Sequence, residues 1–152
     1  METKDLIVQE LEISYTPSEA IIRREKINDS KTAYDMLKGL YNPKTMACQE
    51  EFIVLYLNNA NVPIASYRLS KGGINSSVAD IRLIYSVALK CLATGIILSH
   101  NHPSGTLVPS THDIQLTKRI REVGKIMEII VLDHIILSPF GAYYSFSDDS
   151  MF

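Results

Sequence analysis

The sequence has few cysteines and no long apolar run, and each shortage excludes a class of protein. Cys48 and Cys91 are the only two cysteines in 152 residues, too few for a disulfide framework. We expect both to be buried thiols. No stretch approaches the run of about 20 apolar residues that spans a bilayer, and the first ten residues lack the basic-then-apolar pattern of a secretion signal. The expectation is a cytoplasmic protein without a membrane partner.

An excess of positive charge is also missing. Lys and Arg number 15 against 17 Asp and Glu, which gives a formal net charge of −2. No overall positive field would therefore draw the chain to a phosphate backbone, and nucleic acid is unsupported as a partner. The short basic clusters are expected on solvated faces. With 46% hydrophobic and 21% charged residues, the composition indicates one globular domain, and nothing in it specifies an oligomeric state.

Apolar periodicity predicts an arm followed by an α+β domain. Residues 6–15 alternate as a strand does, and residues 16–28 carry Pro17 and scattered charges, so we expect an N-terminal arm and linker over 1–28 and the domain over 29–152. Ser30 is the expected N-cap of a helix that ends before Asn42-Pro43.

Further along the chain, short β-rich runs alternate with segments whose apolar residues recur at helical spacing. We expect strands at 52–57 and 62–69, with the second broken at 71–73, and a helix over 78–92 terminated by Gly95. A buried strand should then run from Gly95 to His100, followed by a helix from Ser110 and strands at 129–132, 135–137 and 142–146. This pattern predicts a mixed or antiparallel sheet with helices on its faces.

Three of the four histidines lie between Ser99 and Asp113. In an extended segment side chains alternate, so His100 and His102 project to one side and can reach a common metal. Gly105 permits a turn that brings the next helix back, and with it Asp113. Two nitrogens, one carboxylate oxygen and an open fourth position are typical of catalytic zinc. The segment therefore predicts a site for one Zn²⁺ per chain.

Each of these residues also has a simpler explanation. Ser110 and Asp113 have capping-box spacing, so Asp113 could serve only the helix N-terminus. His112 points about 100° away from Asp113 on a helix and is a poor fourth ligand. His134 lies in an apolar strand pair and is better explained as a hydrogen-bonded core residue than as a ligand.

The pattern His100-x-His102-Pro103, followed by Ser110 and Asp113, resembles the JAMM motif of metallopeptidases. The sequence around this motif resembles the RadC-like JAB/MPN branch of that family. Further likeness in 50–55, 71–73, 96–99, 132–136 and 143–146 extends over about residues 29–152. The resemblance implies an MPN (JAB1, cytidine-deaminase-like) fold, a β-sheet flanked by helices, with one catalytic zinc. The expectation is a short form of this family, because residues 1–28 are too few for the N-terminal helix-hairpin-helix region that is usual in RadC proteins.

The resemblance also implies a glutamate as general acid/base, at the position of Glu50. Glu51 is adjacent, and a shift of one residue turns a strand side chain to the opposite face. We favour Glu50 because it shares a face with Phe52, whereas Glu51 is expected to be solvent-exposed. A strand-start carboxylate without a catalytic role stays open for both. By the same resemblance, Ser110 would hydrogen-bond the water or the developing oxyanion.

The resemblance implies hydrolysis of a peptide or isopeptide bond in a peptide or protein substrate that the sequence does not identify. One alternative is a zinc-containing, non-catalytic binding module associated with DNA repair or recombination. Another is an MPN scaffold without metal, which the intact His100, His102 and Asp113 disfavour.

Overall fold

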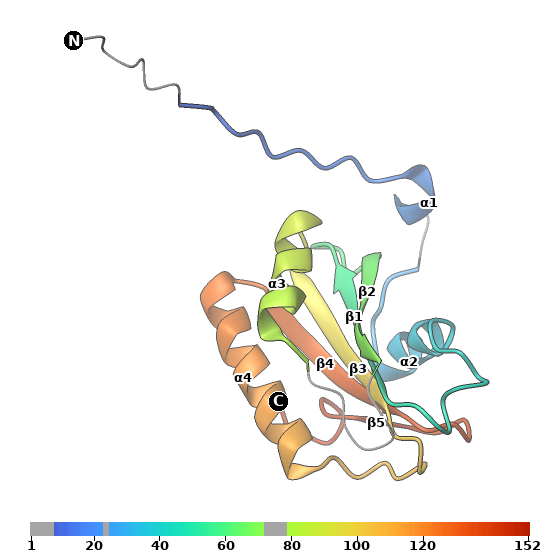
Figure 1. Cartoon of the computed structure of the whole chain (residues 1–152). Helices are drawn as coiled ribbons and strands as arrows, with labels where there is room; N and C mark the ends of the chain where they lie inside the picture. Colours follow the sequence, from blue (N-terminus) through green and yellow to red (C-terminus); the bar gives the residue numbers. More distant parts are fainter. Residues whose placement is uncertain (1–7, 23–24, 72–78) are drawn as a thin grey trace.

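The computed structural model describes residues 8–22, 25–71 and 79–152, which include a five-stranded sheet with helices on both faces (Figure 1). The strands are β1 (Glu51–Leu57), β2 (Pro63–Lys71), β3 (Gly95–Asn101), β4 (Ile130–Leu137) and β5 (Tyr143–Ser145), in the spatial order β2-β1-β3-β4-β5. Strands β3 and β4 pair in parallel, and the other neighbours pair antiparallel. The expected α+β class with a mixed sheet is confirmed.

The helices form a layer on each face of the sheet. Helix α3 (Ile81–Lys90) and helix α4 (Thr111–Met127) cover one face, and helix α2 (Ser30–Lys38) covers the other. The even-numbered Ile96 and Leu98 of β3 pack with α3 and α4, whereas the odd-numbered Ile97 packs with α2. Because this alternation continues along the strand, His100 is directed toward the face that carries α4.

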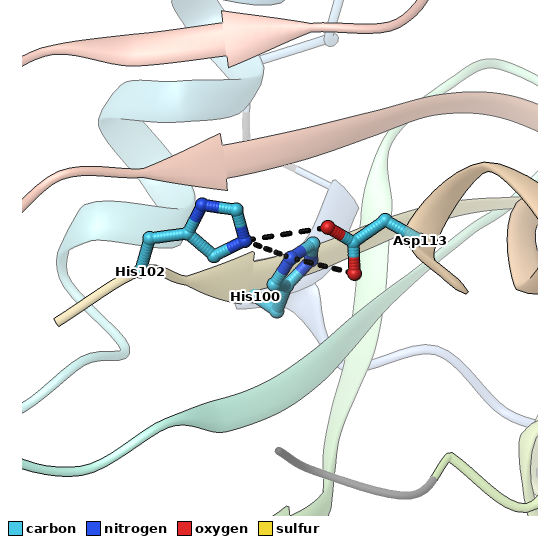
Figure 2. Close-up of side chains that lie close together, drawn as sticks. All are labelled: His100, His102 and Asp113. Carbon is cyan, nitrogen blue, oxygen red and sulfur yellow. Dashed lines mark hydrogen bonds and ion pairs between the residues drawn. The ribbon is translucent and has the colours of Figure 1, made fainter. Parts of the chain in front are cut away.

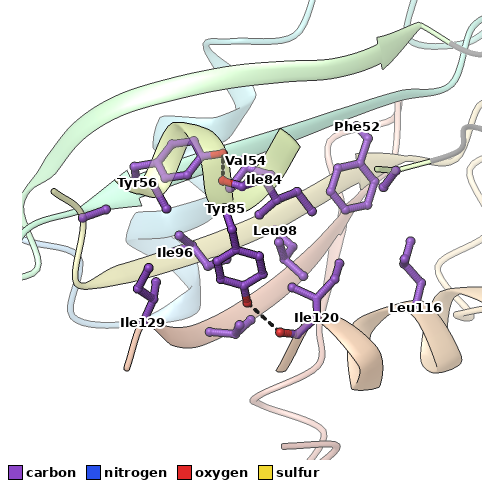
Figure 3. Close-up of a cluster of buried hydrophobic side chains, with 14 residues drawn as sticks. Phe52, Val54, Tyr56, Ile84, Tyr85, Ile96, Leu98, Leu116, Ile120 and Ile129 are labelled. Atoms are coloured by element: carbon purple, nitrogen blue, oxygen red, sulfur yellow. Dashed lines mark hydrogen bonds between the residues drawn. The ribbon is translucent and has the colours of Figure 1, made fainter. Parts of the chain in front are cut away.

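Two buried tyrosines hold α3 and α4 in place (Figure 3). Tyr56 of β1 donates its hydroxyl proton to the carbonyl of Ile84 at 2.9 Å, and Tyr85 of α3 donates to the carbonyl of Ile120 at 2.6 Å. Burial raises the pKa of Tyr85 to about 12, so the hydroxyl stays protonated and can donate. These bonds join the sheet to α3 and α3 to α4, and so position the helix that carries Asp113.

Two helix ends differ from expectation by a few residues. The N-cap of α2 is Asp29, not Ser30, because the Asp29 side chain accepts a hydrogen bond from the backbone N–H of Thr32. The α3 helix does not run to Gly95: Leu92 turns left-handed with φ 53°, and the N–H of Ala93 reaches back to the carbonyl of Ala88. Gly95 begins β3, as expected for the buried strand.

The strands also depart from expectation at two places. The runs 129–132 and 135–137 are joined in the single strand β4. The pairing of β4 with β3 is irregular at Leu132, where the register shifts by one residue. Residues 8–15 form no strand, since no described strand pairs with them; Val8, Leu11 and Ile13 are each 82% exposed. Residues 6–7 and 72–78 lie outside the described residues.

The arm meets the domain at Ile27, which is buried on the α2 side and whose N–H bonds the carbonyl of Asn61. Before it, helix α1 (Glu19–Ile22) and residues 8–18 lead away from the sheet (Figure 1). The division into 1–28 and 29–152 stays a prediction.

The cysteine expectation was wrong. Cys48 is exposed and Cys91 is partly buried, because the first lies in an irregular surface segment and the second at the C-cap of α3. Both are free thiols. Among the described residues, no helix combines the length and the apolarity needed to cross a bilayer.

Candidate metal centre

His100, His102 and Asp113 converge at the end of β3 and the start of α4 (Figure 2). His100 is in β3, His102 follows it, and Asp113 lies in the first turn of α4. The Nε2 atoms of the two histidines are 2.9 Å apart. Asp113 Oδ1 lies 3.3 Å from Nε2 of His100, and Asp113 Oδ2 lies 3.4 Å from Nε2 of His102. Within the described parts of the chain, this is the group of His, Cys, Asp and Glu side chains arranged to hold a metal.

The donor set fits zinc. Two atoms bound about 2.0–2.1 Å from one tetrahedral metal lie about 3.3 Å from each other, close to the observed separations. Nδ1 of His102 lies 2.6 Å from the carbonyl oxygen of Thr106. A carbonyl only accepts, so Nδ1 carries the proton and Nε2 can offer a lone pair. The His100 side chain is only 2% exposed, whereas that of His102 is 16% exposed, so the site is open on the His102 side.

Asp113 caps the helix and also faces the histidines. Its Oδ2 accepts the backbone N–H of Ser110 at 2.8 Å, and Ser110 Oγ accepts the backbone N–H of Asp113 at 3.0 Å. The two explanations offered by the sequence are therefore compatible, because a carboxylate has enough lone pairs for both. The capping box fixes the rotamer that turns Asp113 toward His100 and His102.

The electrostatics of the site favour positive charge between the ligands. Burial alone would raise the pKa of Asp113, but the neighbouring imidazole rings of His100 and His102 outweigh it and hold that pKa well below its usual value. Reciprocally, the hydrogen bond with Asp113 raises the pKa of His102. A carboxylate facing two imidazole nitrogens thus attracts a proton or a metal ion.

Glu50 and Glu51 have different environments. Glu50 is half-buried just before β1, and its charge contributes to the raised pKa of His102, so it lies within electrostatic range of the ligands. Glu51 is 3% exposed and forms an ion pair with Arg68 on β2. The expectation that Glu51 is solvent-exposed was wrong, because Arg68 compensates its buried charge.

Asn101 connects the segment before β1 to the strand that carries His100. Its Oδ1 accepts the backbone N–H of Glu51 at 2.8 Å, and its Nδ2 donates to the carbonyls of Met46 and Gln49 at 2.8 and 2.9 Å. The side chain is fully buried. These bonds flank Glu50 on both sides, so Asn101 restrains the backbone of the candidate base relative to the histidines.

Ser110 and His112 lie at the rim of the site. Ser110 is exposed, and its hydroxyl oxygen is used as the N-cap of α4. A hydroxyl that accepts one hydrogen bond still has a proton to donate, so its oxyanion role stays a prediction. His112 is exposed and is not a member of the group of His100, His102 and Asp113.

His134 lies behind His100, where the sequence did not place it. It is fully buried, as expected for a core histidine, and its ring is stacked on Phe146 with centroids 4.8 Å apart. Its Nε2 lies 2.8 Å from Nδ1 of His100, and its Nδ1 lies 2.6 Å from Oγ1 of Thr117. Burial, followed by the charge of His100, lowers the pKa of His134 well below its usual value. No local pattern identified Thr117 or this partner for His134, since the contact depends on pairing of β3 with β4.

The model of the family described as RadC-like JAB domain matches residues 27–151. "UPF0758 protein" sequences from Flavobacterium johnsoniae and Porphyromonas gingivalis are each 43% identical over 135 residues, or 89% of this chain. They are covered over 57% and 58% of their own length. One from Finegoldia magna is 48% identical over 89 residues, 59% of this chain and 40% of its own length. The chain thus spans little more than half of the first two relatives.

Proposed function

The chain belongs to the RadC-like JAB domain family, and from this starting point we propose that it is a zinc-dependent hydrolase of peptide or isopeptide bonds. The convergence of His100, His102 and Asp113, with donor atoms all within 4.8 Å of one another, is the observation that carries the proposal. Glu50, directly before the strand β1 that pairs with β3, would supply the carboxylate that such a reaction needs.

The ligand set would hold one zinc ion with a coordination position open on the partly exposed side of His102. Bound zinc would polarise the scissile carbonyl and lower the pKa of a water molecule to about 7. Asp113 would balance part of the ion's charge, and its capping box would keep the carboxylate in place before the metal arrives.

Glu50 would accept a proton from the attacking water and return it to the leaving amine. In this hydrolysis, the C–N bond of the substrate breaks and the water oxygen bonds to the carbonyl carbon. One water proton is then found on the new carboxyl group and the other on the new amine. At neutral pH the carboxyl group then ionises. Ser110, whose hydroxyl proton is available, would donate to the oxyanion. Asn101 would keep Glu50 at a constant distance from the ligands through its backbone bonds.

The first experiment measures metal content and metal-dependent hydrolysis. Wild-type protein purified without chelator should contain close to one zinc per chain, and His100→Ala and His102→Ala should lose it. Turnover is followed on a peptide library and on isopeptide-linked peptides, before and after chelation. Less than about a tenth of an equivalent of zinc after zinc-supplemented refolding would overturn the metal site. Full zinc with no hydrolysis would favour the alternative of a non-catalytic binding module.

A pair of neighbouring variants tests the general base. Glu50→Gln keeps shape and zinc but cannot accept a proton, so turnover should fall by about 10²–10⁴. Glu51→Gln is the matched control: it weakens the buried pair with Arg68 and should lower the melting temperature, yet retain turnover per folded molecule. Loss of turnover in Glu51→Gln with normal turnover in Glu50→Gln would reverse the assignment.

A further inference from the structure

A chain of hydrogen bonds runs from the backbone of Asp113 to the ring of His100. Thr117 Oγ1 lies 2.7 Å from the carbonyl oxygen of Asp113, one helical turn earlier, and 2.6 Å from Nδ1 of His134. Nε2 of His134 in turn lies 2.8 Å from Nδ1 of His100. All of these groups are buried. Two of the proposed ligands are thus joined through two residues that lie outside the group of His100, His102 and Asp113.

The hydrogen bonds in this series fix where each proton lies. The carbonyl of Asp113 only accepts, so the single hydroxyl proton of Thr117 is committed to it. The contact between Thr117 and His134 then needs a proton on Nδ1 of His134. A neutral imidazole has only one N–H, so Nε2 of His134 is an acceptor, and the proton between the two histidines belongs to Nδ1 of His100.

The surroundings of His134 are consistent with the neutral ring that this deduction requires. Its side chain has no exposed surface, and it lies between Phe146, at a centroid distance of 4.8 Å, and Phe52, at 5.6 Å. In the described part of the chain the ring's hydrogen-bond partners are His100 and Thr117 and no carboxylate, and burial against aromatic rings with such partners disfavours an imidazolium. The surroundings of His134 therefore favour a neutral ring that accepts a hydrogen bond from His100 over a charged one.

We propose that Thr117 and His134 are positioning residues that hold His100 in its Nδ1–H tautomer, so that the Nε2 lone pair faces the metal position. In the opposite tautomer, Nε2 would present an N–H to His102 and Asp113 and could not bind a metal. At His102, Nδ1 likewise has an acceptor, the carbonyl oxygen of Thr106. The role in metal binding rests on the proposed zinc site, whereas the tautomer is a property of the metal-free chain.

The tautomer is measured directly in metal-free protein. Two-bond ¹⁵N–¹H couplings of the imidazole rings, recorded at pH 8, distinguish protonated from unprotonated ring nitrogens. We expect His100 and His134 both as Nδ1–H species. Finding Nε2–H on His100 would overturn the proposal whether or not the protein binds zinc or hydrolyses peptides, so this failure is distinct from failure of the proposed function.

The effect on the metal is tested with Thr117→Val, which removes the hydroxyl and keeps the shape. Loss of such an outer hydrogen bond typically weakens metal binding about 10–100-fold, and we expect a loss in this range by competition with a chromogenic chelator. Thr117→Ser should restore affinity, and Thr111→Val on the exposed start of α4 is the matched control. Zinc affinity in folded Thr117→Val within about twofold of wild type would contradict the proposed role in metal binding. Should Thr117→Val fail to fold, the wild-type couplings still decide the tautomer.

Discussion

Replacing Asn101 with alanine should destabilise the protein far more than replacing a typical asparagine. The side chain is fully buried and makes hydrogen bonds to the N–H of Glu51 and to the carbonyls of Met46 and Gln49. Alanine can make none of these bonds. The backbone groups that Asn101 satisfies would therefore lose their hydrogen-bond partners.

The magnitude follows from the number of bonds lost. A buried polar group left without a partner costs about 1–3 kcal/mol, so a conservative ~1 kcal/mol for each of the three gives about 3 kcal/mol of unfolding free energy. For a domain of about 150 residues each kcal/mol lowers the melting temperature by about 2–4 °C, which predicts a fall of about 6–12 °C. This is a large share of the 5–15 kcal/mol stability of an ordinary domain.

The assay combines thermal unfolding with amide hydrogen exchange. Thermal unfolding reports the global loss, whereas exchange of the Glu51 amide, protected by Asn101 in wild type, should become much faster than exchange in β3. Asn58→Ala is the matched control: the Asn58 side chain also accepts two backbone bonds, from Ala60 and Val62, but in a more exposed turn where water can replace them. An Asn101→Ala melting temperature no lower than that of Asn58→Ala would refute the reasoning.

Three further predictions concern metal binding, packing and thiol reactivity. Asp113 raises the pKa of His102 above its usual value near 6.5, so His102 gains its proton at a higher pH. Zinc affinity should therefore fall as the pH drops, by about tenfold per pH unit below that pKa. Chelator competition from pH 8 to 5.5 measures this, and a flat profile would count against histidine ligation. In Gly124→Ala the new Cβ would lie 2.5 Å from the carbonyl oxygen of Ile129, so urea unfolding should show a loss of about 1–3 kcal/mol. Gly39→Ala meets only an ordinary 3.5 Å contact and should be neutral or slightly stabilising; equal effects would contradict the packing argument. The exposed Cys48 should react with a thiol reagent faster than Cys91, whose burial raises its thiol pKa and lowers its thiolate fraction, and faster labelling of Cys91 in native protein would oppose this.

Local patterns in the sequence determined much of the fold and the candidate metal-ligand set. Alternation placed His100 and His102 on one side, because that periodicity belongs to any extended chain. The spacing of Ser110 and Asp113 identified the helix start, and the uniformly apolar run before Ser99 identified a buried central strand. Each of these features depends on neighbours within a few residues, so no long-range information was needed.

Contacts between distant segments required the tertiary structure. The burial of Glu51 depends on Arg68, which belongs to the next strand, and the contacts of Asn101 depend on backbone groups 50 to 55 residues earlier. His134 looked like an ordinary core histidine until the crossover through α4 placed β4 beside β3 and brought it to His100. Sequence spacing specifies which face a side chain occupies, but the register between strands decides which side chain it meets there.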